Sequence, residues 1–213
     1  MLRRERTLHW SARSSAALVL VALWLAPAAF AAKLKPQNLT QLITESESIV
    51  AGTVKSVTDG IDANGIPYTE VTLSVSSSAK GSIQDDTEHT FRQFGLLKPR
   101  TLENGRTLLA VSPEGFARWV EGESVVAFLY KPASRTGLQT TAGLAQGKLD
   151  MVNGNLVNAF GNAGLFEGVE IDAELTSAES NLLTTPGAVD AQIFMNLVHR
   201  AVAEQWIENG EMR

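Results

Sequence analysis

Residues 68–80 read YTEVTLSVSSSAK, and this stretch indicates the fold class of the chain. Val71, Leu73 and Val75 alternate with polar residues, the period of two expected of a strand with one buried and one solvated face. The alternation ends at Lys80, directly before a glycine typical of a turn. The stretch therefore predicts a strand of an antiparallel sheet that ends near Lys80.

Ser77 and Lys80 also have the Ser-x-x-Lys spacing of the nucleophile and base in penicillin-recognising acyl enzymes. Those enzymes carry the pair on the first turn of a core helix, whereas here it follows a strand pattern. The Ser-Asp-Asn and Lys-Thr-Gly motifs that accompany the pair are absent from the sequence. We interpret the pair as the end of a strand, with Lys80 facing solvent.

Further strands are expected on both sides of this stretch, preceded by a short helix within residues 36–45. Residues 124–130, SVVAFLY, form a continuous apolar run that predicts a central strand covered on both faces. Asn153-Gly154 between two strand-like runs is the strongest local signal for a hairpin. The other expected strands are residues 49–57, 89–94, 106–111, 148–152, 155–158 and one that follows Gly137.

The chain is expected to close with a helix over residues 186–209. Thr185 can cap it, Pro186 suits its first position, and Gly210 lies where it should stop. Its polar face is not basic, so packing across the sheet is favoured over docking on a membrane. Its apolar side comprises Phe194, Leu197, Val198, Ala201, Val202 and Trp206.

These elements predict a mainly β fold with a C-terminal helix. The specific expectation is a small antiparallel barrel of the oligonucleotide/oligosaccharide-binding (OB) type. A two-sheet β-sandwich is the alternative.

The N-terminus has the features of a signal peptide, residues 1–31. A basic leader precedes an apolar run over residues 16–25, and Ala29-Phe30-Ala31 provides small residues for cleavage after Ala31. Pro27 breaks the apolar run, which is shorter than the roughly 20 residues of a membrane span. We therefore expect export to the periplasm or the exterior, with residues 32–213 forming one domain.

The mature chain is acidic and free of cysteine. The full sequence has 18 Lys and Arg residues and 23 Asp and Glu residues. Four of the arginines and one of the glutamates lie in residues 1–31. The mature chain therefore has 14 basic and 22 acidic residues, a formal charge of −8. This charge disfavours binding to nucleic acid or to anionic lipid. Because the chain contains no cysteine, it has neither disulfides nor a lipobox cysteine for acylation.

Several short motifs occur in a characteristic order: Leu42-Ile43, IVAGTV (49–54), YTEVTL (68–73), Lys80-Gly81, FRQ (91–93), Gly122-Glu123, Phe128-Leu129 and GLAQGK (143–148). Over residues 39–152 this order resembles a group of small secreted bacterial proteins of unknown function. Members of that group are barrel-like and distantly similar to the netrin and tissue-inhibitor-of-metalloproteinase class of OB-like folds. The inhibitors bind the catalytic metal through an N-terminal cysteine, which this chain lacks. The resemblance therefore implies a fold and supplies no activity.

Two segments have candidate binding residues. Gly143, Gln146, Gly147 and Lys148 form a glycine-containing turn without the spacing of a phosphate loop. If the chain binds a partner, this turn and the loop of residues 96–104 are the expected regions, because loops carry recognition on a rigid sheet. Trp119, Phe116 and Tyr68 are the candidate aromatic residues for stacking on a ligand, and a place in the core is the alternative for each.

One short acidic segment contains three carboxylates and an imidazole, from Asp85, Asp86, Glu88 and His89. These groups are common ligands for Ca²⁺ or Zn²⁺. The cluster lacks the spacing of a calcium loop, so a solvated acidic turn is the favoured interpretation. Metal binding is left open, and no metal or other cofactor is assigned.

We expect an exported, non-catalytic binding or accessory module that recognises an exported protein or an envelope polymer. One alternative is an inhibitor or companion of a secreted metallopeptidase, based on the fold resemblance. The other is a hydrolase with an unrecognised site, in which only His89 or His199 could serve as the base for a serine.

Overall fold

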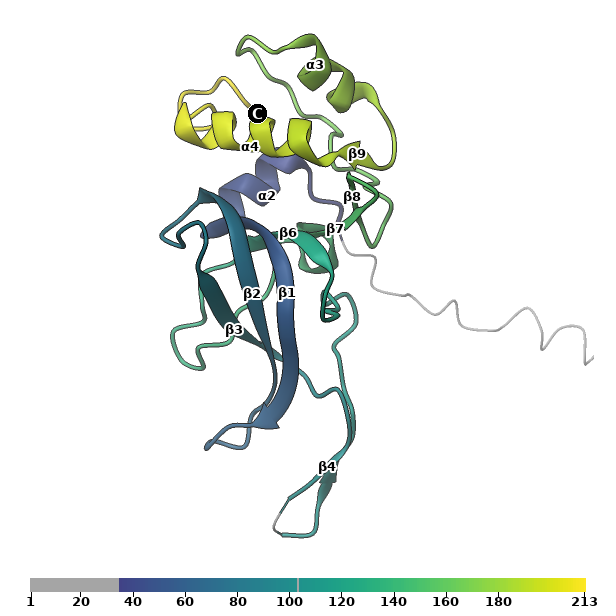
Figure 1. Ribbon diagram of the computed structural model, residues 1–213. Helices are drawn as coiled ribbons and strands as arrows, with labels where there is room; N and C mark the ends of the chain where they lie inside the picture. Colours follow the sequence, from purple (N-terminus) through teal and green to yellow (C-terminus); the bar gives the residue numbers. More distant parts are fainter. Residues whose placement is uncertain (1–34, 103) are drawn as a thin grey trace, which may run out of the picture. The chain divides into compact units, whose positions relative to one another are not determined.

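The alternating residues 68–75 lie in β2, near one edge of an antiparallel sheet with the order β3-β2-β1-β6-β7-β8-β9 (Figure 1). The computed structural model describes residues 35–102 and 104–213, so the predicted signal peptide lies outside the described residues. The strands are β1 (Ser48–Ile61), β2 (Pro67–Lys80), β3 (Glu88–Phe94), β6 (Ser124–Leu129), β7 (Lys148–Val152), β8 (Asn155–Asn158) and β9 (Val189–Asp190), with β4 (Arg100–Thr101) and β5 (Thr107–Leu108) paired separately. The helices are α2 (Leu39–Glu45), the 3₁₀ helix η2 (Leu144–Gly147), α3 (Ser177–Thr184) and α4 (Ala191–Ala203). The mainly β class with a C-terminal helix is confirmed.

Two strands have the burial that their sequences predicted. In β2, Val71, Leu73 and Val75 are at most 2% exposed. Alternate residues of β6 belong to two cores: Val126 and Phe128 pack in the core beneath the helices, and the residues between them pack in a core on the opposite face of the sheet. The prediction of a central strand covered on both faces is therefore confirmed.

The sheet does not close into a barrel, which corrects the specific OB-like expectation. Its end strands, β3 and β9, share no ladder among the described residues. Residues 138–142, where a strand was expected, lie between β6 and β3: Ala142 N donates to Phe128 O at 2.7 Å, and Gln139 N donates to Arg92 O at 2.7 Å. Because this irregular segment makes a single backbone hydrogen bond to β3, the sheet stays open, an arrangement consistent with the sandwich alternative.

Local signals placed the first helix and the predicted hairpin correctly. Asn38 and Gln41 form a capping box at the start of α2. Asn153 and Gly154 connect β7 to β8 with φ angles of 50° and 79°, as a two-residue hairpin turn of this type requires. These features depend on residues adjacent in sequence, which explains why pattern alone predicted them.

The C-terminal helix is shorter than predicted. α4 begins at Ala191, not at residue 186, because Val189 pairs with Leu156 as part of β9 and Asp190 caps the helix by accepting from Ile193 N at 2.9 Å. The helix ends at Ala203, and the chain then turns. Its apolar side does pack on the sheet, as expected, with the rings of Phe128 and Phe194 6.4 Å apart.

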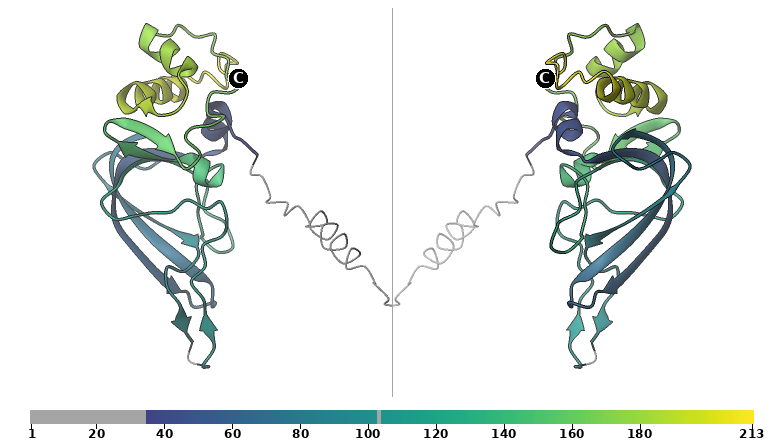
Figure 2. Two further views of the ribbon diagram at one scale, coloured as in Figure 1. Left: turned by 90° about the vertical axis from the view of Figure 1, so that its right-hand side faces the viewer. Right: turned by 90° about the vertical axis from the view of Figure 1, so that its left-hand side faces the viewer.

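A second helix, α3, precedes α4 and was not predicted. Its signal was present in the sequence, because Thr176 and Glu179 form a capping box at its N-terminus. The two side views show the helices at one end of the long strands β1 and β2 and the β4–β5 ribbon at the other end (Figure 2). Among the described residues, no helix combines the length and the apolar character needed to span a bilayer.

Candidate functional site

The predicted binding turn, residues 143–148, is mostly occupied with contacts inside the protein. Gln146 is 5% exposed; its Nε2 donates to Lys35 O at 3.1 Å, and its Oε1 accepts from Gln37 N at 2.8 Å. A Cβ atom on Gly147 would lie 2.0 Å from a backbone carbonyl oxygen, so only glycine fits there. The turn therefore holds the segment before α2 against the sheet.

Lys148 and Trp119, two of the predicted binding residues, do lie together. The Lys148 Nζ is 5.2 Å from the centroid of the Trp119 ring and forms ion pairs with Glu123 at 2.7 Å and Asp150 at 2.5 Å. The side chain of Lys148 is 5% exposed, and Trp119 is 7% exposed and donates from Nε1 to Gln93 Oε1 at 3.1 Å. Neither residue presents a free surface for stacking on a ligand.

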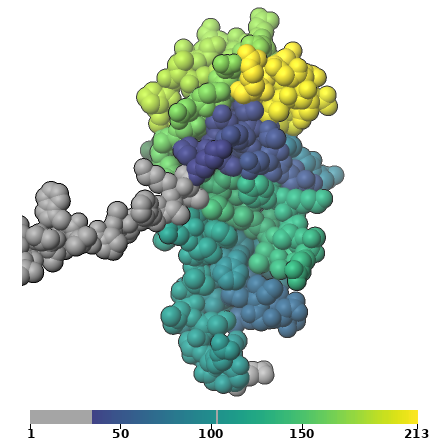
Figure 3. All heavy atoms as spheres, turned by 180° about the vertical axis from the view of Figure 1, so that it is seen from behind, coloured from purple at the N-terminus to yellow at the C-terminus, as the bar shows by residue number. Residues whose placement is uncertain are grey.

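Exposed apolar side chains gather instead along the connection from β3 to β6. This connection borders a depression of about 360 Å³, which we call the distal groove. Leu97 is 55% exposed and Val120 is 62% exposed. The lining residues used below are Leu96, Leu97, Val111, Arg118, Trp119 and Val120. Seen from behind, the teal connection lies at the end of the molecule opposite the yellow C-terminal residues (Figure 3).

Asp59, near the end of β1, holds one wall of the distal groove in place. Its Oδ2 accepts from the backbone N–H groups of Leu97, at 2.8 Å, and Lys98, at 3.1 Å. Arg100 forms an ion pair with its Oδ1 and donates to its backbone oxygen at 2.6 Å. Burial raises the pKa of Asp59, but these hydrogen bonds outweigh burial, so its pKa lies below the usual value. The wall is thus held by an ionised, 3% exposed carboxylate.

The opposite wall of the groove is joined to β3 by a short bridge. Leu96 N donates to Val111 O at 2.7 Å, and Val111 N donates to Leu96 O at 3.1 Å. The strand predicted over residues 106–111 is therefore reduced to β5 and this isolated bridge. The loop of residues 96–104 was expected to bind, but Val111 was expected only as part of a strand, and Arg118 and Val120 had no sequence signal as binding residues.

The acidic segment at residues 85–89 makes separate local contacts. Asp85 accepts from Ser78 N at 2.7 Å, and Glu88 forms an ion pair with Lys55. Burial lowers the pKa of His89, despite a hydrogen bond with a glutamine side chain that raises it. Within residues 35–102 and 104–213, no group of three or more histidine and acidic side chains is placed to hold a metal ion.

The Ser-x-x-Lys pair lies at the end of β2, as predicted, and not on a helix. Lys80 does not face solvent as expected: it is half-buried, its Nζ donates to Ile43 O at 2.7 Å, and burial lowers its pKa. The fold places the Oγ of Ser77 2.9 Å from Nε2 of His199 on α4, a contact between residues far apart in sequence. A serine that hydrogen-bonds a histidine has the arrangement of a nucleophile and its base. In the described part of the chain, no carboxylate hydrogen-bonds to the His199 ring to orient it.

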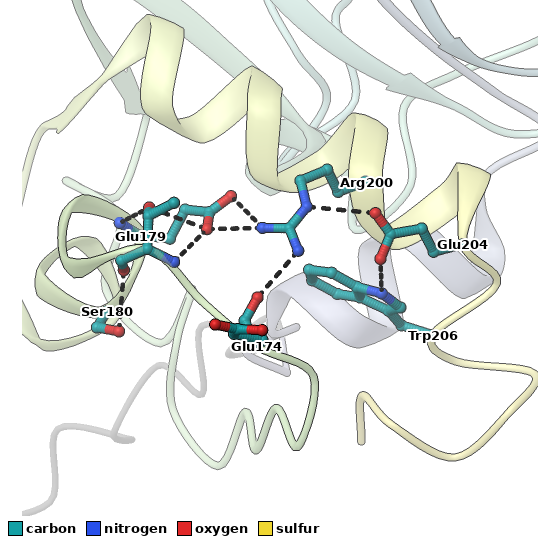
Figure 4. Close-up of polar contacts among 7 residues, drawn as sticks. Glu174, Glu179, Ser180, Arg200, Glu204 and Trp206 are labelled. Atoms are coloured by element: carbon teal, nitrogen blue, oxygen red, sulfur yellow. Dashed lines mark hydrogen bonds and ion pairs between the residues drawn. The ribbon is translucent and has the colours of Figure 1, made fainter.

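Arg200 on α4 joins the two C-terminal helices (Figure 4). Its guanidinium pairs with Glu179 of α3 at 2.9 Å and with Glu204 at 3.3 Å, and it donates to Glu174 O at 2.9 Å. It also lies 5.0 Å from the ring centroid of Trp206. Most donors of this guanidinium are therefore used in contacts within the protein, which indicates a structural role.

Glu179 is the buried partner in this cluster, with a side chain that is 4% exposed. Burial raises its pKa, but hydrogen bonds from the backbone and hydroxyl of Thr176 and from Arg200 outweigh burial, so its pKa lies below the usual value. A cavity of about 390 Å³ beside the cluster is also lined by Asn196 and His199. Ser77 does not line this cavity.

Comparison with known proteins finds no family model, no curated protein and no solved structure that matches the chain. The resemblance to secreted barrel-like proteins, and the metallopeptidase inhibitor that it suggested, therefore stay predictions from the sequence.

Proposed function

We propose that the chain is an exported, non-catalytic binding or accessory module that recognises a partner through the distal groove. The observation that carries the proposal is the exposure of Leu97, Val111 and Val120 around one depression. Contiguous exposed apolar side chains are costly in water and commonly mark interaction sites.

Both walls of the groove are held by hydrogen bonds, which favours a binding surface over a flexible loop. Asp59 holds the chain at Leu97 and Lys98, and the Leu96–Val111 bridge holds the other wall. A preformed surface loses little conformational entropy on binding, which favours affinity.

A protein partner fits the groove better than an envelope polysaccharide. Sugar binding commonly uses an exposed aromatic ring, but Trp119 is 7% exposed and packs edge-on against Phe91 at 5.3 Å. Leu97 and Val120 instead offer aliphatic contacts, which suit apolar side chains of a polypeptide.

Site-specific photo-crosslinking in the producing cells tests the proposal. A photoreactive amino acid replaces Leu97 or Val120 in separate variants, and Val152, 53% exposed on β7, provides the control position. We expect one and the same adduct from both groove positions and none from position 152. An absence of adducts at the groove, or equal adducts at all three positions, contradicts the proposal.

The Ser77–His199 contact favours a hydrolase as the second candidate. In such an enzyme, the Ser77 Oγ would attack an acyl carbon while His199 Nε2 takes its proton. His199 would return this proton to the leaving group as its bond to the acyl carbon breaks, and water would then hydrolyse the acyl-serine. A fluorophosphonate probe tests this: stoichiometric labelling of Ser77 that is lost in H199A, but kept in S74A on the same strand, would establish the hydrolase. Absence of labelling leaves the pair as a contact between β2 and α4.

A further inference from the structure

The connection that carries the distal groove is richer in basic residues than the chain as a whole. The segment from Phe94 to Val120 has four basic and two acidic residues, although the whole chain has a formal net charge of −5. Asp59 neutralises Arg100, whereas Lys98, Arg106 and Arg118 are exposed and form no ion pair with a described residue. The exposed apolar surface is therefore accompanied by basic side chains without an acidic partner among the described residues.

The arrangement of these residues argues against insertion into a lipid bilayer. The β4–β5 ribbon projects farthest from the sheet (Figure 1), but the turn at its end includes the exposed polar residues Asn104 and Arg106. The exposed apolar residues Leu97 and Val120 line the groove at the base of the ribbon. A loop that inserts into a membrane would need apolar residues at its tip.

The edge of β3 beside the groove has backbone groups available for an extended partner. Leu96 uses its outward-facing N–H and C=O in the bridge to Val111. Phe94, two residues earlier, makes no backbone hydrogen bond to a described residue outside the β2–β3 ladder. Arg92 O, on the other side of Phe94, accepts from Gln139 N, so Phe94 is the position on this stretch of β3 where an extended segment can add backbone hydrogen bonds. A folded, rounded surface would not reach these groups.

We propose that the distal groove binds an extended polypeptide segment in which apolar side chains are flanked by carboxylates. The apolar side chains would contact Leu97, Val111 and Val120, and the carboxylates would pair with Lys98 and Arg118. This inference rests on the proposed function and adds the chemical class of the partner. Opposite charge across an interface accelerates association and selects among partners.

Two fluorescent peptides test the charge preference by anisotropy, with the protein purified as the cell processes it. Both have a Leu-Val-Leu core; the acidic probe has aspartates on each side, and the basic probe has lysines. We expect the acidic probe to bind at least about tenfold more tightly, with an affinity that falls as salt is added. Equal affinity for the two probes, or no dependence on salt, overturns the inference.

Charge reversal identifies the side chains responsible. The pair K98E/R118E should weaken binding of the acidic probe by about tenfold, since exposed charge pairs contribute modestly but additively. K131E/R135E changes the net charge equally at two exposed residues outside the groove and should have less than about a twofold effect. An equal loss in both variants overturns the inference, because it would reflect net charge alone.

Two further outcomes separate this inference from the proposed function. L97S/V120S should abolish binding of the acidic probe, while V152S, an exposed apolar position elsewhere, leaves it unchanged. Crosslinking at both groove positions without preference for the acidic probe would overturn the charge inference and leave the binding module intact. Binding to anionic phospholipid vesicles, but not to the peptide, would also overturn the inference and assign the basic residues to a membrane surface.

Discussion

Replacing Asp59 with alanine tests how the distal groove is held. The carboxylate is 3% exposed and accepts two backbone N–H groups as well as the Arg100 guanidinium. Hydrogen bonds to a charged group contribute about 1.5–3 kcal/mol each when buried, but Lys98 and Arg100 can rehydrate after the substitution. We therefore expect D59A to lower the free energy of unfolding by about 2–3 kcal/mol in total.

Urea denaturation and hydrogen exchange measured by mass spectrometry provide the assay. Exchange should accelerate at the amides of Leu97 and Lys98 and across residues 96–111. Because the pKa of Asp59 is below its usual value in the folded state, its stabilising contribution is present above the unfolded-state pKa and is lost as the pH falls through the folded-state pKa. The difference between D59A and the unmodified protein should therefore shrink below the usual aspartate pKa of about 3.9.

Asp62 offers a matched control in the turn after β1. Its Oδ1 also accepts from two backbone N–H groups, those of Asn64 and Ile66, both at 2.8 Å. D62A should destabilise that turn without accelerating exchange over residues 96–111. If D59A changes the unfolding free energy by less than about 0.5 kcal/mol, the range of a neutral surface substitution, and leaves exchange at residues 96–111 unchanged, Asp59 does not hold the groove.

Three further substitutions test the internal contacts by urea denaturation. R200M removes the ion-pair partner of the buried Glu179 and should lower the free energy of unfolding by about 2–4 kcal/mol. Because the pKa of Glu179 is lowered in the folded state, this loss should diminish as the pH falls through the folded-state pKa. A loss that does not depend on pH would contradict the ion pair's role. G147A places a Cβ against Ala142 O and should lower the free energy of unfolding by at least about 2 kcal/mol. Unchanged stability would contradict this steric clash. K148M removes the cation beneath the distal groove and should lower the free energy of unfolding by about 1–2 kcal/mol. A variant more stable than the unmodified protein would show that the ion pairs of Lys148 do not offset the cost of burying its charge.

Pattern and local chemistry predicted the parts of the fold that depend on neighbouring residues. The alternation at Val71 and Leu73 predicted β2, and the apolar run of residues 124–129 predicted a strand covered on both faces. The start of α4 was wrong because Val189 pairs with a distant strand, and that pairing prevailed over the local signal of Pro186. Backbone pairing between distant segments is not encoded in a short window of sequence.

The candidate sites depended still more on long-range contacts. Gln146 and Lys148 were plausible binding residues by sequence, but the fold buries both among internal partners. Ser77 and His199 had been considered separately as a possible nucleophile and a possible base. They form a hydrogen bond only because α4 packs against β2. Side-chain exposure, which decides whether a residue can bind a partner, is a property of the packed chain.

Periodicity and turn chemistry act between near neighbours, so a cysteine-free, mainly β chain with a helix after the sheet could be predicted from the residues alone. The open sheet and the grouping of Leu97, Val111 and Val120 around one groove arise from the folded chain. Asp59 and the Leu96–Val111 bridge hold together segments that no short stretch of sequence relates.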